Sequence, residues 1–392
     1  MRILCINQFF WPDAAPTAVL LEDVVSKMAA DGHDMTVICG DNPYRMAGER
    51  RPVPPARIRR MRIPRLPRGR FGRAASDLIF LLLAAARSLL SRRADVVVTL
   101  STPPFIGLIG TLLSITGRSR HYVWEMDLYP EIVADLGYFS PASLVYRSMR
   151  WVARLIRGHA DGVLVLGDCM RRRMLAAGVP PDRLHVVENW VDGRIISARE
   201  PVRAPVLEIL YSGNAGLAHD LETVAAAMAK LREDARFRFR FFGHGPRMRE
   251  LVDFCRARDI ENVEFAGFQP REEFDRALAR CHIGLVTQRN ACTGSVVPSK
   301  VYGILAAARP VLFIGPADAT PAQVIQRHEC GWHIECGDVD GLADLLWRLA
   351  EEPSLLHSAG RNARRAFLEY YDMPKGVDRF VQALGLQGSA AG

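Results

Sequence analysis

Blocks of hydrophobic residues alternate with amphipathic stretches along the chain, and this pattern predicts strands that are each followed by a helix. In the first half, apolar runs at residues 3–6 and 35–39 predict strands on either side of a helix over residues 18–31. Gly32 stops that helix. Further buried strands are expected at residues 96–100, 121–124 and 162–166. Strands that alternate with helices form parallel sheets, so the first half is predicted to be one α/β unit.

The second half repeats this pattern, with glycines placed soon after its strands. A strand at residues 207–211 runs into Ser212-Gly213-Asn214-Ala215-Gly216, and Asp220 is positioned to cap the next helix. Residues 238–242 and 263–265 predict further strands, which lead into Gly243 and Gly267. Glycines let the backbone approach a ligand closely. Because ligands bind at the carboxyl ends of parallel strands, these turns are predicted to line a binding site.

Residues 293–316 combine a polar turn, a helix start and a buried strand. Ser299 is the predicted N-cap of the helix. Lys300 then lies beside the free backbone N–H groups at the positive helix end, an arrangement that suits a phosphate. Arg309 precedes a proline that ends the helix, and residues 311–315 predict a strand buried on both faces. A Ser-Lys pair at a helix start is also an ordinary cap, so both interpretations stay open.

Length and composition fit a globular protein of two domains. The chain has 392 residues, 49% hydrophobic and 24% charged, which is too long for one typical core and too hydrophobic for disorder. Met1 and Arg2 run directly into the first strand, so no secretory leader is expected. The 8 cysteines show no paired framework, which predicts a reducing, cytoplasmic location. The first strand lacks a following G-x-G-x-x-G, which argues against a dinucleotide oxidoreductase.

One group of residues has a spacing that resembles a zinc site: His328, Cys330, His333 and Cys336. Zinc sites more often contain tight Cys-x-x-Cys pairs. Here residues 330–332 instead look like a helix end, and residues 333–335 like a short strand. We therefore expect no metal and no other cofactor.

The net charge of +8 is concentrated in one proline-rich stretch, whose arginines are Arg50, Arg51, Arg57, Arg59, Arg60, Arg62, Arg65, Arg68, Arg70 and Arg73. An apolar run follows at residues 78–86, far shorter than the ~20 residues that a membrane span needs. A basic loop beside a short apolar helix suits the surface of an anionic bilayer. The candidate contacts are Arg57, Arg59, Arg60 and Arg62. A buried helix with a solvated loop explains the same pattern. Nucleic acid is a poorer partner, because aromatic residues are sparse and no reading motif is present.

Several short motifs, taken in order, resemble one enzyme family. They are Asn7-Gln8-Phe9-Phe10-Trp11-Pro12, Asp127-Leu128-Tyr129-Pro130-Glu131, Glu188-Asn189-Trp190-Val191-Asp192, Tyr211-Ser212-Gly213-Asn214 and Val297-Pro298-Ser299-Lys300-Val301-Tyr302. Each motif is weak by itself, but together they span nearly the whole chain. The sequence resembles the retaining, family-4 glycosyltransferases. Within that family it is most similar to bacterial colanic acid and O-antigen transferases, including N-acetyl-L-fucosaminyltransferases.

The resemblance implies an α/β fold of the GT-B type, in which two Rossmann-like domains face each other across a cleft. The implied domains are an acceptor-binding domain at residues 1–196 and a nucleotide-sugar-binding domain at residues 197–370. Residues 371–392 would form a tail and a helix that crosses back to the first domain. Helix-like apolar spacing around Pro374 fits a kinked crossover helix.

The resemblance also implies roles for individual residues. The donor diphosphate would contact Gly213, Asn214, His219, Ser295, Ser299, Lys300 and Tyr302. The base would lie near Gly243, Gly267 and Phe268. The histidine that the family often has in the first domain is replaced near Met126, which leaves Asp127 and Glu131 as the candidate catalytic acids. Helix N-termini and a lysine stabilise a departing diphosphate without a metal. The diphosphate itself can take the acceptor proton, so no protein nucleophile is needed.

The chain departs from the family at the phosphate site. The family's two glutamates, eight positions apart, fall here on Ser295 and Gly303, so neither carboxylate is present. Asn214 stands where the family has an arginine, and His219 is the candidate substitute. More of the positive charge therefore falls on Lys300.

Together these inferences predict a retaining glycosyltransferase that uses a nucleotide-diphosphate donor, expected to be a UDP-sugar. The acceptor is expected to be a polyprenyl-diphosphate-linked or other glycan in cell-surface polysaccharide synthesis. The enzyme would be cytoplasmic and peripheral on the inner face of the cell membrane. Asp127 is explained equally well as a helix cap. The alternatives are a GT-B sugar-nucleotide epimerase and an inactive binding homologue, the latter because both glutamates are missing.

Overall fold

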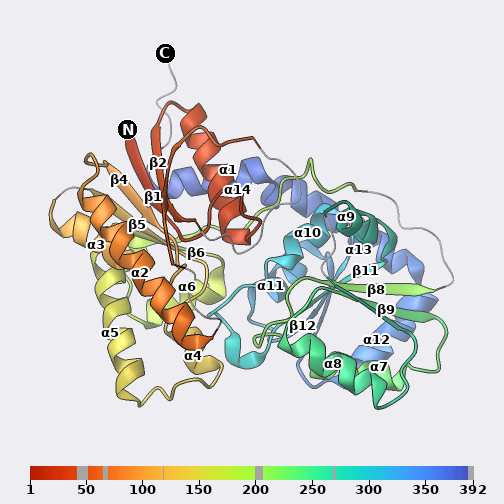
Figure 1. Cartoon of the computed structure of the whole chain (residues 1–392). Coiled ribbons are helices and arrows are strands. Elements are labelled where there is room, and N and C mark those ends of the chain that lie inside the picture. The colour runs from red at the N-terminus through yellow and green to blue at the C-terminus, as the bar shows by residue number, and fades with distance from the viewer. Residues whose placement is uncertain (42–51, 65–68, 118, 199–205, 268–270, 387–392) are drawn as a thin grey trace. The chain divides into compact units, whose positions relative to one another are not determined.

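The computed structural model describes residues 1–41, 52–64, 69–117, 119–198, 206–267 and 271–386. The chain divides into two compact units, which are described separately. Unit 1 comprises Met1–Glu188 together with Val377–Gly392, and unit 2 comprises Asn189–Gly376. Each unit is a parallel sheet covered by helices, as Figure 1 shows.

Unit 1 contains the strands β1 (Arg2–Ile6), β2 (Asp34–Gly40), β3 (Arg57–Met61), β4 (Val96–Thr99), β5 (Arg120–Glu125), β6 (Gly162–Val165) and β7 (Leu184–Val186). They form one parallel sheet in the order β3-β2-β1-β4-β5-β6-β7. Its helices are α1 (Pro16–Ala30), α2 (Arg70–Leu89), α3 (Gly107–Ile115), α4 (Glu131–Asp135), α5 (Leu144–His159) and α6 (Asp168–Ala176). The strand order reverses at β1, between β2 and β4. Such a switch point is where a parallel sheet binds its ligands.

The arginine-rich stretch contains a strand that the sequence pattern does not predict. Residues 57–61 form β3 at the sheet edge and pair with β2, where a solvated loop is expected. The side chains of Arg57, Arg59 and Arg60 are exposed, whereas those of Ile58 and Met61 are half-buried. Charged side chains on an edge strand oppose pairing with another chain.

The apolar run at residues 78–86 lies in the second half of α2. Phe80 and Ala84 are buried in a cluster over the sheet, as expected for a helix that packs on a parallel sheet. Leu78, Leu82 and Leu83 are 57%, 63% and 39% exposed. The helix is therefore neither fully buried nor polar on its outer side.

Unit 2 contains the strands β8 (Leu207–Ser212), β9 (Phe237–Phe242), β10 (Val263–Ala266), β11 (Ile283–Thr287), β12 (Val311–Ile314) and β13 (Gly331–Ile334). They form a parallel sheet in the order β10-β9-β8-β11-β12-β13. The helices are α7 (Glu222–Lys230), α8 (Pro246–Arg256), α9 (Arg271–Arg280), α10 (Lys300–Ala306), α11 (Thr320–His328), α12 (Val339–Glu351) and α13 (Pro353–Ala366). Asp220 caps α7 as predicted, because its carboxylate accepts from the N–H groups of Glu222 and Thr223 at 3.0 Å each.

The helix that starts at Lys300 is shorter than the pattern predicts. It ends at Ala306, and Ala308 follows with a φ of 59°. The Arg309 side chain is fully buried and donates to the backbone carbonyls of Leu278 and Ala279. Arg309 therefore joins two segments of unit 2 in addition to preceding the proline that was expected to end the helix.

The last helix, α14 (Met373–Ala383), begins in unit 2, and from Val377 onward it belongs to unit 1. The Phe380 ring packs 4.5 Å from the Trp124 ring, and the Tyr122 hydroxyl donates to the Leu384 carbonyl at 3.0 Å. The predicted crossover is confirmed. The predicted kink is wrong, because Pro374 lies in the first turn of α14, where proline needs no N–H partner.

Candidate functional site

Lys300 stands at the start of α10 and is half-buried, where the sequence suggests an open helix end. Its ammonium nitrogen lies 2.8 Å from the Tyr211 hydroxyl and 3.1 Å from the Asn214 carbonyl oxygen. It also lies 3.1 Å from Nε2 of His219 and 4.4 Å from the centre of the Tyr211 ring. No carboxylate pairs with Lys300 within the described part of the chain. Burial without a counter-charge lowers the pKa of Lys300 to about 7.

The hydrogen-bond partner of Nδ1 determines which nitrogen of the His219 ring carries the hydrogen. Nδ1 lies 2.7 Å from the Thr287 carbonyl oxygen, which can only accept, so Nδ1 carries the hydrogen. Nε2 then has a lone pair and accepts from Lys300. Burial, and secondarily the charge of Lys300, lowers the pKa of His219 to about 3. His219 is therefore a neutral acceptor at physiological pH.

Gly213 and Gly243 allow the loops of this site to lie in close contact, because they have no Cβ atom. Gly213 and Gly243 have φ values of 120° and 130°, which favour glycine. A Cβ atom on Gly243 would lie 2.1 Å from the Gly213 carbonyl oxygen, and one on Gly213 would lie 2.9 Å from Cε of Lys300. The close approach that the sequence predicts for a ligand is thus made by the loop after β8, the loop after β9 and Lys300.

The other predicted donor-binding residues occupy different environments. Ser295 is fully buried, and its hydroxyl donates to the Cys292 carbonyl at 3.1 Å. Tyr302 is also fully buried, with its ring 5.1 Å from that of Tyr371. Neither side chain is placed to meet a ligand in this arrangement. Ser299 is exposed and occupies the N-cap position, but its side chain makes no capping hydrogen bond.

The predicted base-binding residues also lie in different environments. Gly243 packs against the neighbouring loop, and Gly267 is exposed directly after β10. Phe268 lies outside the described residues.

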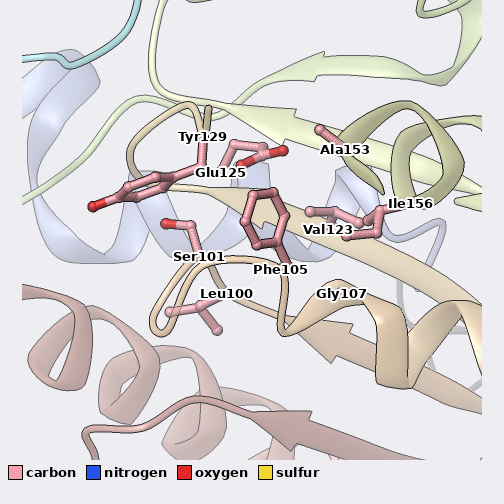
Figure 2. Close-up of a pocket in the computed structure, with 9 residues that line it drawn as sticks. All are labelled: Leu100, Ser101, Phe105, Gly107, Val123, Glu125, Tyr129, Ala153 and Ile156. Atoms are coloured by element: carbon pink, nitrogen blue, oxygen red, sulfur yellow. The ribbon is translucent and has the colours of Figure 1, made fainter. Parts of the chain in front are cut away.

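Unit 1 has a cavity at the carboxyl ends of β4 and β5 (Figure 2). Its lining residues are Leu100, Ser101, Phe105, Gly107, Val123, Glu125, Tyr129, Ala153 and Ile156. In this view, the Phe105 ring lies between Ser101 and the Val123 and Ile156 side chains. The Ser101 hydroxyl oxygen accepts from the backbone N–H groups of Met126 and Asp127, at 3.1 and 3.3 Å. These bonds fix the turn that carries Asp127.

Asp127 lies in that turn and is half-buried. Burial, and then the nearby charge of Glu125, raises the pKa of Asp127 to about 6. The N-cap of α4 is Pro130, so Asp127 does not cap that helix. A carboxyl group with such a pKa can accept or donate a hydrogen bond close to neutral pH.

Glu131, the other predicted acid, belongs to a buried ion pair. Arg157 of α5 lies between two carboxylates, with Nε 2.9 Å from Glu125 and Nη1 2.9 Å from Glu131. It also donates to the Tyr129 carbonyl at 3.0 Å. Because the Glu131 carboxylate is 10% exposed and holds Arg157, its position differs from that of an acid facing substrate.

Two residues near Asp127 are absent from the sequence-based prediction. Asp77 of α2 accepts from Nε2 of Gln8 at 3.2 Å, and burial raises the pKa of Asp77. Burial and the charges of Asp127 and Asp77 raise the pKa of Tyr129 to about 12. Asp77 follows an arginine-rich stretch, and only the fold brings it to the Asp127 side of the sheet.

The predicted surface arginines have unequal environments. Arg57 pairs with Asp34 at 3.3 Å, and Arg60 donates to the Trp11 carbonyl at 2.6 Å. Arg59 and Arg62 are exposed and make no hydrogen bond or ion pair with any described residue. No helix in the described ranges is long and apolar enough to cross a bilayer.

The residues with zinc-like spacing have separate partners. His328 contacts the Tyr371 hydroxyl at 3.1 Å, and His333 contacts the Gly315 carbonyl at 2.7 Å. Cys330 is buried, and Cys336 donates to the Gln288 carbonyl. Among the residues that the structure describes, no three His, Cys, Asp or Glu side chains gather as a metal site would require.

Comparison with protein-family models identifies both halves of the chain. Residues 17–190 match the "Glycosyl transferase 4-like domain", and residues 194–366 match "Glycosyl transferases group 1". Together with the two parallel sheets, these matches define a glycosyltransferase of the GT-B class. The chain belongs to family 4 of these enzymes.

Individual relatives agree with this assignment. The chain is 25% identical to WbjE of Pseudomonas aeruginosa, a glycosyltransferase by name, over 97% of this chain and 96% of WbjE. It is 24% identical to WcaI of Escherichia coli K12, a colanic acid biosynthesis glycosyl transferase by name, over 78% of this chain and 81% of WcaI. The predicted family and the predicted transferase class are confirmed.

Solved structures show the same fold at lower identity. Sucrose-phosphate synthase of Thermosynechococcus elongatus has a TM-score of 0.76 at 15% identity, covering 98% of both chains. HepE of Anabaena, solved with UDP-glucose, has a TM-score of 0.72 at 14% identity, covering 99% of this chain and 100% of HepE. These similarities confirm the predicted GT-B fold.

Proposed function

We propose that the protein is a retaining glycosyltransferase that moves a sugar from a UDP-sugar to a polyprenyl-diphosphate-linked or other glycan acceptor in cell-surface polysaccharide synthesis. The observation that carries the proposal is Lys300, a half-buried cation whose hydrogen-bond partners are all neutral. A diphosphate would supply the missing negative charge. The HepE structures that contain UDP and UDP-glucose support this donor class. The name of WcaI supports a role in polysaccharide synthesis.

In this proposal, Lys300 stabilises the charge that develops on the diphosphate as the glycosyl–phosphate bond breaks. Retention follows if the acceptor hydroxyl attacks the face from which the diphosphate leaves and a diphosphate oxygen takes its proton. Asp127 orients the acceptor hydroxyl through a hydrogen bond. Glu131 holds Arg157 and supports the turn indirectly. Since Lys300 supplies positive charge at the leaving group, we propose a reaction that needs no metal.

Incubation of the purified protein with UDP-sugars, with and without a polyprenyl-diphosphate-linked glycan, tests this function. Transfer that needs the acceptor and keeps the anomeric configuration, measured by NMR of the product, is the expected result. Conversion of the nucleotide sugar without acceptor would instead indicate an epimerase. UDP binding with neither reaction would indicate an inactive binding homologue.

We also propose that the outer face of unit 1 docks on the anionic inner face of the cell membrane, which would make the enzyme cytoplasmic and peripheral. Helix α3 contacts both α2 and α5, so the three helices lie side by side (Figure 1). Each exposes large apolar side chains, namely Leu78, Leu82 and Leu83 on α2, Leu108, Leu112 and Ile115 on α3, and Leu144, Val145 and Trp151 on α5. Exposed arginines accompany them on α5: Arg147, Arg150 and Arg154. Apolar and basic side chains together fit an anionic lipid surface.

Vesicle binding tests the membrane proposal. Binding to phosphatidylglycerol vesicles should fall as salt rises, because each basic residue near such a surface contributes about 1 kcal/mol that salt screens. Replacement of Arg59 and Arg62 by glutamine should weaken it modestly, and Trp151→Ser should weaken it at every salt concentration. UDP affinity should stay unchanged in all these variants. Absence of binding at low salt would overturn the membrane contact and leave the transferase proposal intact.

A further inference from the structure

All three N–H donors of the Lys300 ammonium are engaged in this structure. They meet the Tyr211 hydroxyl, the Asn214 carbonyl and Nε2 of His219, at 2.8, 3.1 and 3.1 Å. A phosphate oxygen can bind this ammonium only if it replaces one of these acceptors, because an ammonium has no fourth hydrogen.

The three acceptors differ in how easily they can be replaced. Tyr211 is fully buried and His219 is half-buried, whereas Asn214 is exposed. The Asn214 carbonyl also accepts from the Tyr211 hydroxyl at 3.1 Å. It therefore keeps a hydrogen bond when Lys300 turns to a ligand, and the exchange leaves no buried acceptor unpaired.

The other two contacts are fixed by the fold. The Thr287 carbonyl at the end of β11 holds the Nδ1–H of His219, so the lone pair of Nε2 is directed at Lys300. The Tyr211 ring is held in the unit 2 core, 5.8 Å from the Phe241 ring. Asp220 directly follows His219 in the sequence, but its carboxylate accepts hydrogen bonds from the backbone N–H groups of Glu222 and Thr223 in α7.

We infer that Tyr211 and His219 are positioning residues, which hold the Lys300 ammonium while a diphosphate oxygen of the donor replaces the Asn214 carbonyl. This inference rests on the proposed function. Both residues hold Lys300 through lone pairs on uncharged atoms. A carboxylate in either place would neutralise the ammonium and compete with the phosphate.

A double-mutant cycle on UDP affinity, measured by isothermal titration calorimetry, tests the inference. Tyr211→Phe and His219→Ala should each weaken UDP binding by about tenfold, because Lys300 loses one of its two fixed contacts. In a Lys300→Ala background, the same changes should cost less than about twofold, since the group that they position is gone. His219→Gln should recover part of the affinity, because its amide oxygen can accept from Lys300.

Tyr370→Phe, at an exposed tyrosine in the same unit, is the matched control and should bind UDP like the wild type. Thermal unfolding verifies that each variant is folded. Equal losses with and without Lys300 would overturn the positioning role, since they would show that the two residues act independently of the lysine. If the wild type did not bind UDP, the proposed donor itself would be wrong, and the inference would fail with it.

Discussion

Two basic residues, one in each unit, meet the cost of burial in opposite ways. Arg157 of unit 1 lies 2.9 Å from each of two buried carboxylates, whereas Lys300 of unit 2 contacts neutral acceptors. The charges of Glu125 and Glu131 keep Arg157 protonated, while uncompensated burial lowers the pKa of Lys300 to about 7. A buried cation that is paired with carboxylates needs no ligand to balance its charge. An uncompensated one gains by binding an anion, so the comparison separates a structural group from a functional one.

The largest expected effect is that of removing Arg157. Arg157→Ala leaves Glu125 and Glu131 buried without a counter-charge and should cost about 3–5 kcal/mol of unfolding free energy. Urea denaturation measures this loss. Arg154→Ala, at an exposed residue one turn earlier, should stay within about 0.5 kcal/mol of the wild type. Similar losses in the two variants would show that the ion pair does not support unit 1.

Lys300→Ala should have the complementary effect, with a large loss of ligand affinity. Removing a charged phosphate contact should cost about 1.5–3 kcal/mol, or roughly 10- to 100-fold in the Kd for UDP. The unfolding free energy should change less than in Arg157→Ala, because no charge is left unpaired. Lys230→Ala, at an exposed lysine of α7, is the control. Wild-type UDP affinity in Lys300→Ala would reject the donor site.

The pH dependence of UDP binding sharpens the comparison. Lys300 must be protonated to attract a phosphate, and its pKa in the free protein is lowered to about 7. Affinity should therefore fall as pH rises from 7.5 to 9, by up to about tenfold per pH unit. The titratable groups that face Lys300 stay neutral over this range, since the pKa of His219 is lowered to about 3 and that of Tyr211 is raised. Lys300→Arg keeps its charge, so its affinity should be flat over the same range.

The smallest expected effect is that of a chelator. If Lys300 supplies positive charge at the diphosphate, sugar transfer in excess EDTA should stay within about twofold of the untreated rate. The rate is measured with the same UDP-sugar and acceptor before and after chelation. Loss of transfer that magnesium or manganese restores would show that a metal supplies the charge that we assign to Lys300.

The sequence predicts the parts of the fold that depend on local pattern. Apolar runs separated by helix-like stretches identify most strands of both sheets, although β7 and β11 are not among those predicted, and Asp220 is correctly identified as a cap. The edge strand β3 escapes prediction because three of its five residues are arginines, and a run of charged side chains normally indicates a loop. Its strand structure comes from pairing with β2, which is a tertiary effect.

The candidate sites are harder to predict, because ionic partners are distant in sequence. Lys300 is recognisable at a helix start, but its contact with Tyr211 joins residues 89 positions apart. The spacing of Glu131 gives no sign that Arg157, 26 positions later, will hold it. Ser295 occupies a position where the family has a glutamate, and Tyr302 belongs to the family-like motif at residues 297–302, yet both are fully buried. Motif position thus locates the region of the site, and packing decides which side chains are available.

The crossover of α14 has a consequence for the order in which the protein can be made. On the ribosome, residues 1–188 emerge first, but the segment from Val377 that completes their unit emerges only after all of unit 2. Until then, the Trp124 ring lacks Phe380 and the Tyr122 hydroxyl lacks the Leu384 carbonyl. Unit 1 therefore stays unfinished throughout translation of unit 2. A nonsense mutation shortly before Val377 would damage the earliest part of the chain, although it removes only the latest.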